Sequence, residues 1–485
     1  MPRCGRAARA LSIAAAASFL VAAEPRAHAA NSVQGTAEVA VGWTDNVFNA
    51  PSTPYAPLSC DAAGNCTPTP PACDSTKSTT CAQGAPLPRF SDFFFQLRPG
   101  IAYTTGAARA VQRLAFNFNA DLFVLHPQGN SYTNTLDWNG FFIPSKKTEL
   151  MVGLQSQEGR INTLNLQNTA DATGLAVSPS LATSTTFFTQ GANEALVDHL
   201  TKQWNFAQAL TFLAFIPLSP RTLPDTYTTT VDLGAERLFA LDAVGVDLRS
   251  EYVVYGATRD TTTGTVAPLQ QQVIDSAIAR WRRDWSNFWS TEAALGLIMA
   301  MNAADGSERI WQPYALAVAR YFNERATGEL RYEHSIVPNP LSGATFVADQ
   351  ATLRVTVPLP QKTRLFLSGS GGYEHAQLYN QDSTGGQRTG LVATAEIALA
   401  DASLTWQALP YLGVFARYEY YRQFGHPSDL GFMQPNIERN IVLIGVAGIY
   451  PVAAAARVPN RPGLRVDRAD MPMIPEPHSL PAVPH

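Results

Sequence analysis

The sequence predicts an all-β fold: a closed antiparallel transmembrane β-barrel of about 18 strands, with short periplasmic turns and long extracellular loops. Three observations lead to this prediction. Apolar and polar residues alternate with period two through most of the chain. The alternating segments run for roughly ten to fifteen residues, which suits tilted strands that cross a bilayer. Tight breaks between segments alternate with long polar loops, as in outer-membrane barrels.

The hairpin at residues 228–256 illustrates the alternation. In its first arm the apolar residue Val231 precedes Asp232, and in its second arm Leu248 precedes Arg249. Successive side chains of a strand point to opposite faces, so each arm has one apolar and one charged face. Two such arms joined by a few residues form a hairpin.

Similar segments follow one another along the chain. In chain order the expected strands are about Gln34–Thr44, Phe90–Thr104, Ala110–Val124, Asn134–Ile143, Thr148–Gln157, Thr186–Leu200, Asn205–Pro217, the two arms of Thr228–Gly256, Gln270–Arg283, Trp289–Met301, Arg309–Tyr321, Ala326–Val337, Thr345–Val357, Thr363–Ala376, Arg388–Trp406, Tyr411–Gln423 and Arg439–Pro451.

A sheet that faces lipid cannot leave an edge of unpaired N–H and C=O groups, so its first and last strands are expected to pair. A secreted β-sandwich or propeller is the alternative. A propeller needs a repeated motif in each blade, which the sequence lacks, and a sandwich of this length would be divided by a linker. Both considerations favour the barrel.

Residues 1–29 have the features of a cleaved secretory signal peptide. Three arginines precede the apolar run Ala10–Ala23, and Ala27 and Ala29 form a small-x-small cleavage site before Ala30. An uncleaved anchor is the alternative, but a run of about fourteen residues is too short to span a bilayer. We therefore expect the barrel, residues 30–451, in the outer membrane of a Gram-negative bacterium.

The composition argues against a nucleic-acid partner. The chain has a formal net charge of −4 and only 15% charged residues, whereas nucleic-acid binding requires a basic surface. The expected partners are instead outer-membrane lipid and a small polar solute.

Four cysteines lie in one expected extracellular loop, residues 51–88. They are Cys60, Cys66, Cys73 and Cys81. In an oxidising compartment they are expected to form two disulfides, with three possible pairings. A zinc site is the alternative, but the spacings lack the CxxC pairs that such sites favour.

The face opposite the apolar face of each strand is expected to line the lumen, and it is rich in charge. The candidate lumen-lining residues are Asp232, Glu236, Asp247, Arg249, Glu251, Glu292, Glu329, Arg331, Glu333, Arg354, Glu396, Arg417 and Glu419. Two interpretations are compatible with them: Arg–Glu pairs that brace the wall, and a pathway that guides a polar solute. A barrel of this size is wide enough for an aqueous channel.

No catalytic constellation is recognisable: the sequence has no GxSxG, HExxH or phosphate-binding glycine loop. We expect neither an enzyme nor a bound cofactor or metal. Aromatic residues near the ends of strands fit the belts that barrels place at both membrane interfaces.

The first strand carries a family resemblance. AEVAVGWTDNVF, Ala37–Phe48, resembles the opening strand of a bacterial outer-membrane β-barrel family found beside exopolysaccharide export machinery. The matching residues are Gly42, Trp43, Asp45, Asn46, Val47 and Phe48. The repeated hairpins and the last strand, RNIVLIGVAGIY, are similar to the same family. The resemblance implies a wide barrel that passes secreted polysaccharide across the outer membrane beside a periplasmic polysaccharide-export protein.

Two features depart from that family. A Pro-rich tail, residues 452–485, follows the last strand, where ordinary barrels end on an aromatic residue; we expect it to be extended and periplasmic. The four-cysteine loop is also outside the family pattern. Besides polysaccharide export, a general or solute-specific porin and a structural or adhesive surface barrel therefore stay open.

Overall fold

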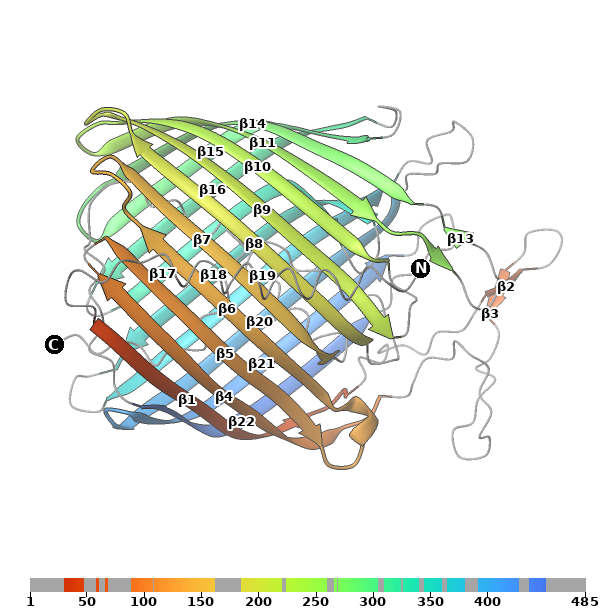
Figure 1. Cartoon of the computed structure of the whole chain (residues 1–485). Coiled ribbons are helices and arrows are strands. Elements are labelled where there is room, and N and C mark those ends of the chain that lie inside the picture. The colour runs from red at the N-terminus through yellow and green to blue at the C-terminus, as the bar shows by residue number, and fades with distance from the viewer. Residues whose placement is uncertain are drawn as a thin grey trace, which may run out of the picture.

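A computed structural model of the whole chain gives the architecture (Figure 1). The structure describes residues 30–47, 58–60, 66–68, 89–107, 109–161, 185–219, 224–259, 266–267, 269–303, 309–323, 326–339, 344–359, 364–379, 391–426 and 436–450. The predicted signal peptide and the Pro-rich tail lie outside these residues.

Eighteen antiparallel strands form one sheet that closes on itself, which confirms the predicted fold class. The wall strands are β1 (Ala30–Thr44), β4 (Asp92–Ala107), β5 (Ala110–Phe123), β6 (Ser131–Phe142), β7 (Thr148–Ile161), β8 (Thr185–His199), β9 (Trp204–Ser219), β10 (Thr226–Leu238), β11 (Asp242–Tyr255), β14 (Gln270–Asp284), β15 (Trp289–Asn302), β16 (Ile310–Asn323), β17 (Ala326–Asn339), β18 (Ala344–Pro358), β19 (Leu365–Tyr379), β20 (Leu391–Leu409), β21 (Leu412–His426) and β22 (Ile437–Tyr450).

The barrel closes where β1 meets β22, a junction that we call the seam. Each wall strand pairs with its neighbour in the chain, and β1 pairs on one side with β4 and on the other with β22. The β1–β22 ladder runs from Gly35 opposite Tyr450 to Thr44 opposite Ile441. In Figure 1 the seam is the place where the red strand β1 lies beside β22. The sheet therefore has no free edge in the membrane.

The two ends of the barrel differ. At one end, the short-turn end, the wall strands are joined by only two to six residues. At the other, the long-loop end, the connections contain between four and 47 residues. The latter carry the hairpins β2–β3 (Leu58–Cys60 and Cys66–Pro68) and β12–β13 (Thr258–Arg259 and Val266–Ala267). Bacterial barrels place such short turns in the periplasm.

The long connection between β5 and β6 also holds a single 3-10 turn, η1 (Pro127–Gly129). Among the described residues, no helix is both long enough and apolar enough to cross a bilayer.

The wall has an apolar outer face and a polar inner face. In β11 the side chains of Val244, Val246 and Leu248 are 47%, 54% and 54% exposed, whereas Glu251, on the other face, is 7% exposed. The same alternation recurs around the barrel. The exposed apolar face is the one that meets hydrocarbon, since a charge placed there would cost free energy.

Aromatic side chains gather on the outer face at the short-turn end. The Trp289 and Tyr321 rings lie 4.9 Å apart between centroids, and the Arg283 guanidinium lies 4.5 Å from the centre of the Trp285 ring. Amphipathic rings of this kind anchor a barrel at the level of the lipid headgroups.

Two of the four loop cysteines lie in the described residues. Cys60 ends β2, Cys66 begins β3, and the register places them directly opposite each other. Cys73 and Cys81 lie outside the described residues, and no disulfide is shown.

The outer face provides a direct test of the fold. We expect Val246→Arg to lower the free energy of unfolding by about 2–4 kcal/mol, because it places a guanidinium near the middle of the apolar band. Urea unfolding in lipid vesicles, followed by tryptophan fluorescence, measures this. The control is Val246→Leu; equal stability of the two variants would contradict a lipid-facing Val246.

The β2–β3 hairpin narrows the three possible disulfide pairings. Residues that face each other across an antiparallel ladder have Cα atoms about 4.5–5.5 Å apart, which a disulfide can bridge. We therefore expect a Cys60–Cys66 bond in the exported protein. Peptide mapping without reducing agent tests it, and a fragment that joins Cys60 to Cys73 or to Cys81 would contradict it.

Candidate functional site: the polar lumen and the closing seam

All but one of the predicted lumen-lining residues lie on the inner face of the wall. They share the phase of buried polar residues such as Glu236, Glu251, Glu292 and Arg331, opposite the phase of the exposed leucines. The inner-face residues are Asp232 and Glu236 on β10, Asp247, Arg249 and Glu251 on β11, Glu292 on β15, Glu329, Arg331 and Glu333 on β17, Arg354 on β18, and Arg417 and Glu419 on β21.

One group of these charges centres on Arg249. Its guanidinium lies 3.8 Å from the Asp232 carboxylate on β10 and 3.4 Å from Glu251 on its own strand. One strand further round the barrel, Arg280 of β14 lies 3.5 Å from Asp247. These three neighbouring strands are thus joined by side chains as well as by backbone hydrogen bonds.

A second group centres on Arg320 of β16, which the sequence analysis did not single out. It donates to Glu292 on β15 at 3.2 Å and to Glu329 on β17 at 2.9 Å, so it bridges three strands. Arg354 faces Glu329 from β18 in the register. Arg320 was hard to predict because its strand also points the apolar residues Leu316 and Val318 inward. The alternation of apolar and polar residues in β16 therefore does not show which face lines the lumen.

The remaining inner pairs follow the same pattern. Arg331 donates to Glu333 at 2.6 Å, and Arg417 lies 3.7 Å from Glu419, two residues along the same strand in each case. The Arg331–Glu333 pair is largely buried, whereas Glu419 in the second pair is partly exposed. Both pairs hold the charged side chains against the wall.

Carboxylates outnumber guanidinium groups on the inner face of the described strands. The inward carboxylates are those of Glu38, Asp92, Asp121, Asp137, Glu149, Asp232, Glu236, Asp247, Glu251, Glu292, Glu329, Glu333, Glu374, Asp401 and Glu419. The inward guanidinium groups are those of Arg98, Arg113, Arg249, Arg280, Arg282, Arg320, Arg331, Arg354, Arg417 and Arg439. Within the described ranges no three His, Cys, Asp or Glu residues are grouped so that they hold a metal ion.

Glu396 differs from its predicted place: it lies on the outer face. It is opposite His375 in the register, with the two side chains 3.9 Å apart, and shares its face with the exposed Leu404. The neighbouring Ile397 points inward instead and is fully buried in a cluster with Phe346 and Tyr421. An apolar cluster inside the barrel thus reverses the phase that a simple apolar-outward rule assigns to β20.

One sector of the inner wall, strands β5–β8, is mostly neutral; it comprises four of the eighteen strands. Asn119 Nδ2 donates to Thr133 Oγ1 at 3.3 Å, and Thr189 Oγ1 donates to Gln157 Oε1 at 3.4 Å. The inner wall therefore has a strongly ionic part and a four-strand sector, the neutral sector, that is lined mainly by amides and hydroxyls. No sequence motif marks this division, which follows only once the phase of every strand is known.

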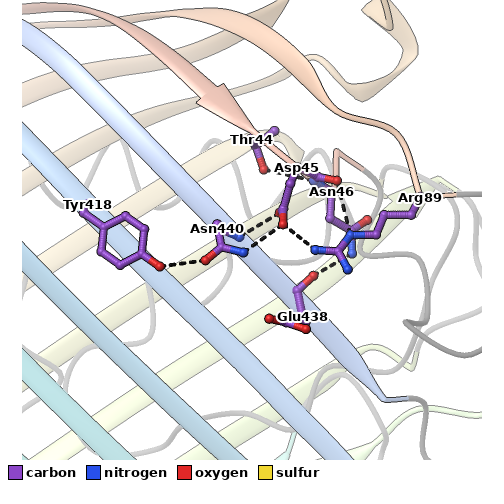
Figure 2. Close-up of polar contacts among 7 residues, drawn as sticks. All are labelled: Thr44, Asp45, Asn46, Arg89, Tyr418, Glu438 and Asn440. Atoms are coloured by element: carbon purple, nitrogen blue, oxygen red, sulfur yellow. Dashed lines mark hydrogen bonds and ion pairs between the residues drawn. The ribbon is translucent and has the colours of Figure 1, made fainter.

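The seam is fastened at the long-loop end by a cluster that we call the latch (Figure 2). The Asp45 carboxylate, just after β1, accepts from the backbone N–H and from Nδ2 of Asn440 on β22, each at 2.8 Å. It also pairs with Arg89, which precedes β4. Tyr418 of β21 donates to Asn440 Oδ1 at 2.7 Å. The Asp45 carboxylate thus joins β1 to β22. Through Arg89 it also joins β1 to the start of β4.

The other motif residues act at the same place. Asn46 is fully buried, and its Nδ2 donates to the Glu438 carbonyl of β22 at 2.9 Å (Figure 2). A Cβ at Gly42 would overlap the Phe94 ring and lie 2.8 Å from Leu443 Cδ2, so a larger residue would push β4 and β22 apart. The motif in the first strand therefore closes the barrel. Phe48 lies outside the described residues.

The latch generates a stability prediction. We expect Asp45→Ala to lower the free energy of unfolding by about 1–3 kcal/mol, since it removes charge-assisted hydrogen bonds and leaves the Asn440 amide without its acceptor. Urea unfolding in vesicles measures this. The matched control is Asp242→Ala, whose carboxylate lies 3.5 Å from Arg283 far from the seam. A loss no greater than that of the control would contradict the latch.

The chain matches no protein-family model, and no curated protein matches it. Among solved structures it is similar to the outer membrane protein opdK from Pseudomonas aeruginosa, with 10% identity, 86% of this chain and 99% of that chain covered, and a TM-score of 0.38. It is also similar to OccK2 (OpdF) from Pseudomonas aeruginosa in complex with glucuronate (9%, 87% and 98%, 0.41) and to the FrpB iron transporter from Neisseria meningitidis (10%, 86% and 82%, 0.41).

Proposed function

We propose that the chain forms a channel through the outer membrane for polar solutes, with secreted polysaccharide as its cargo. We also propose that a signal peptide at residues 1–29 directs the export of the chain. We assign no catalytic step to the barrel. The observation that carries it is the polar inner face of an 18-stranded closed wall. A barrel of that size is wide enough for an aqueous channel.

The arrangement of the inner charges supports a passage. The pairs of Arg249, Arg320, Arg331 and Arg417 each link residues of one strand or of two neighbouring strands. Ion pairs of this kind run along the wall and do not reach across the barrel. They keep the inner face wet and neutralise much of its charge, which suits a solute that has to pass without being trapped.

The choice of polysaccharide has a narrower basis, the resemblance of Ala37–Phe48 to the opening strand of the export-associated family. A periplasmic polysaccharide-export protein belongs to the same part of the proposal. A porin for small polar solutes would use the same wall, so the two alternatives differ in the size of the solute that passes.

Single-channel conductance of the purified barrel in a planar bilayer tests the channel itself. We expect open-channel currents with a preference for cations over anions, because carboxylates outnumber guanidinium groups on the inner face. No conductance in any preparation that has folded, as shown by heat-modifiable gel mobility, would contradict the proposal.

Swelling of liposomes that contain the barrel separates the two cargo sizes. Entry of dextrans longer than a few sugar units supports a polymer conduit. Entry of monosaccharides and disaccharides alone would replace polysaccharide with small solutes.

A further inference from the structure

We infer that the neutral sector of the inner wall, strands β5–β8, is a binding track for uncharged, polyhydroxylated solutes, so that the channel prefers neutral saccharides to acidic ones. The inference rests on the proposed function and specifies its substrate class. The track is a stripe of side chains on strands β5–β8, which we call the amide stripe: Asn117, Asn119, Asn139, Gln155, Thr189 and Asn193.

The stripe crosses four neighbouring strands and about half of the height of the wall. Asn139 lies three residues from the short-turn end of β6, and Asn119 lies four residues from the long-loop end of β5, opposite Thr133. At the level of Asn139 the register connects it through Gly153 to Asn193 on β8. A solute in the lumen therefore meets amides over the middle part of the wall.

Gly153 explains how two of the amides lie together. A Cβ at this position would be 3.1 Å from Asn139 Oδ1 and would overlap Asn193 Oδ1. Because glycine has no side chain, the Asn139 and Asn193 amides lie over β7 from both sides. They form a continuous patch of donors and acceptors three strands wide.

The amides of the stripe are more exposed than the threonines beside them. The hydroxyl residues Thr133 and Thr135 are only 7% and 5% exposed, whereas Asn117, Asn139 and Asn193 are partly exposed. The threonines thus lie beneath the amides. The amides are the groups that a passing solute contacts.

The chemistry of an amide matches that of a sugar. Each carboxamide offers both donors and an acceptor, and a sugar hydroxyl also donates and accepts. Neutral hydrogen bonds form without the cost of desolvating a charge. Conduction requires sites that are favourable enough to enter and weak enough to leave. A row of similar neutral groups satisfies both requirements.

The overall charge of the inner face disfavours an acidic solute. Next to the stripe, Asp137, at 2% exposed, lies opposite Gln155, and Arg113 of β5 lies opposite Asn139. Over the whole described inner face, carboxylates outnumber guanidinium groups. A negatively charged saccharide is repelled by such a wall, whereas a neutral one is not.

Block of ion current by two probes of equal length tests the inference: maltohexaose, which is neutral, and hexagalacturonate, which is acidic. We expect maltohexaose to block the wild-type channel at a concentration at least about tenfold lower. In the double variant Asn139→Leu, Asn193→Leu we expect its blocking concentration to rise about tenfold or more, since two neutral hydrogen bonds are lost. Salt conductance should stay within about twofold.

The matched control is Asn134→Leu, which makes the same substitution on the outer face of β6 and should leave block unchanged. If the leucine variant does not fold, Asn139→Asp with Asn193→Asp keeps the side-chain size and should weaken block by hexagalacturonate further. The inference is overturned if ion currents are seen but maltohexaose does not block them selectively, or if it blocks the double variant and the control equally. Either result is still compatible with a channel. No ion current at all overturns the proposed function itself.

Discussion

Everything in this molecule depends on one constraint: inside hydrocarbon, each backbone N–H and C=O group has to be paired within the protein. A sheet meets that constraint only by closing, so β1 pairs with both β4 and β22. The latch of Asp45, Asn440 and Arg89 adds side-chain hydrogen bonds at the junction between the two ends of the wall. Closure in turn creates two separate surroundings, lipid outside and the lumen inside. The period-two alternation of the sequence follows from that separation.

The inner face combines two kinds of polar surface. On strands β10–β17, Arg249 and Arg320 each contact two carboxylates, so guanidinium groups and acids hold each other against the wall. On strands β5–β8, Asn139 and Asn193 approach each other over Gly153 and offer neutral donors and acceptors. The first arrangement braces neighbouring strands. The second is where we propose that a neutral solute binds.

Much of this architecture could be predicted from the sequence, because alternation is a local signal. The expected number of strands agrees with the structure, and the expected bounds of strands such as Trp289–Met301 differ from those observed by a few residues. The face of the wall on which a side chain lies was harder to predict where apolar residues also point inward. Ile397 packs inside the barrel and moves Glu396 to the outer face, and Leu316 and Val318 concealed Arg320. The role of Asp45 could not be predicted, because its partner Asn440 is 395 residues away in the chain.

The measurement that tests this account most directly is a cysteine scan of β11 in the folded barrel, from Val244 to Val254, in a background without native cysteines. Each thiol is reacted with a charged, water-soluble reagent and, separately, carries a fluorophore exposed to a lipid-soluble quencher. We predict alternation: the partly exposed inner positions 247 and 249 react with the water-soluble reagent, and positions 244, 246, 248, 250, 252 and 254 are quenched from the lipid. Reaction of both sets with the water-soluble reagent, or quenching of both from the lipid, would contradict a wall that separates lipid from an aqueous lumen.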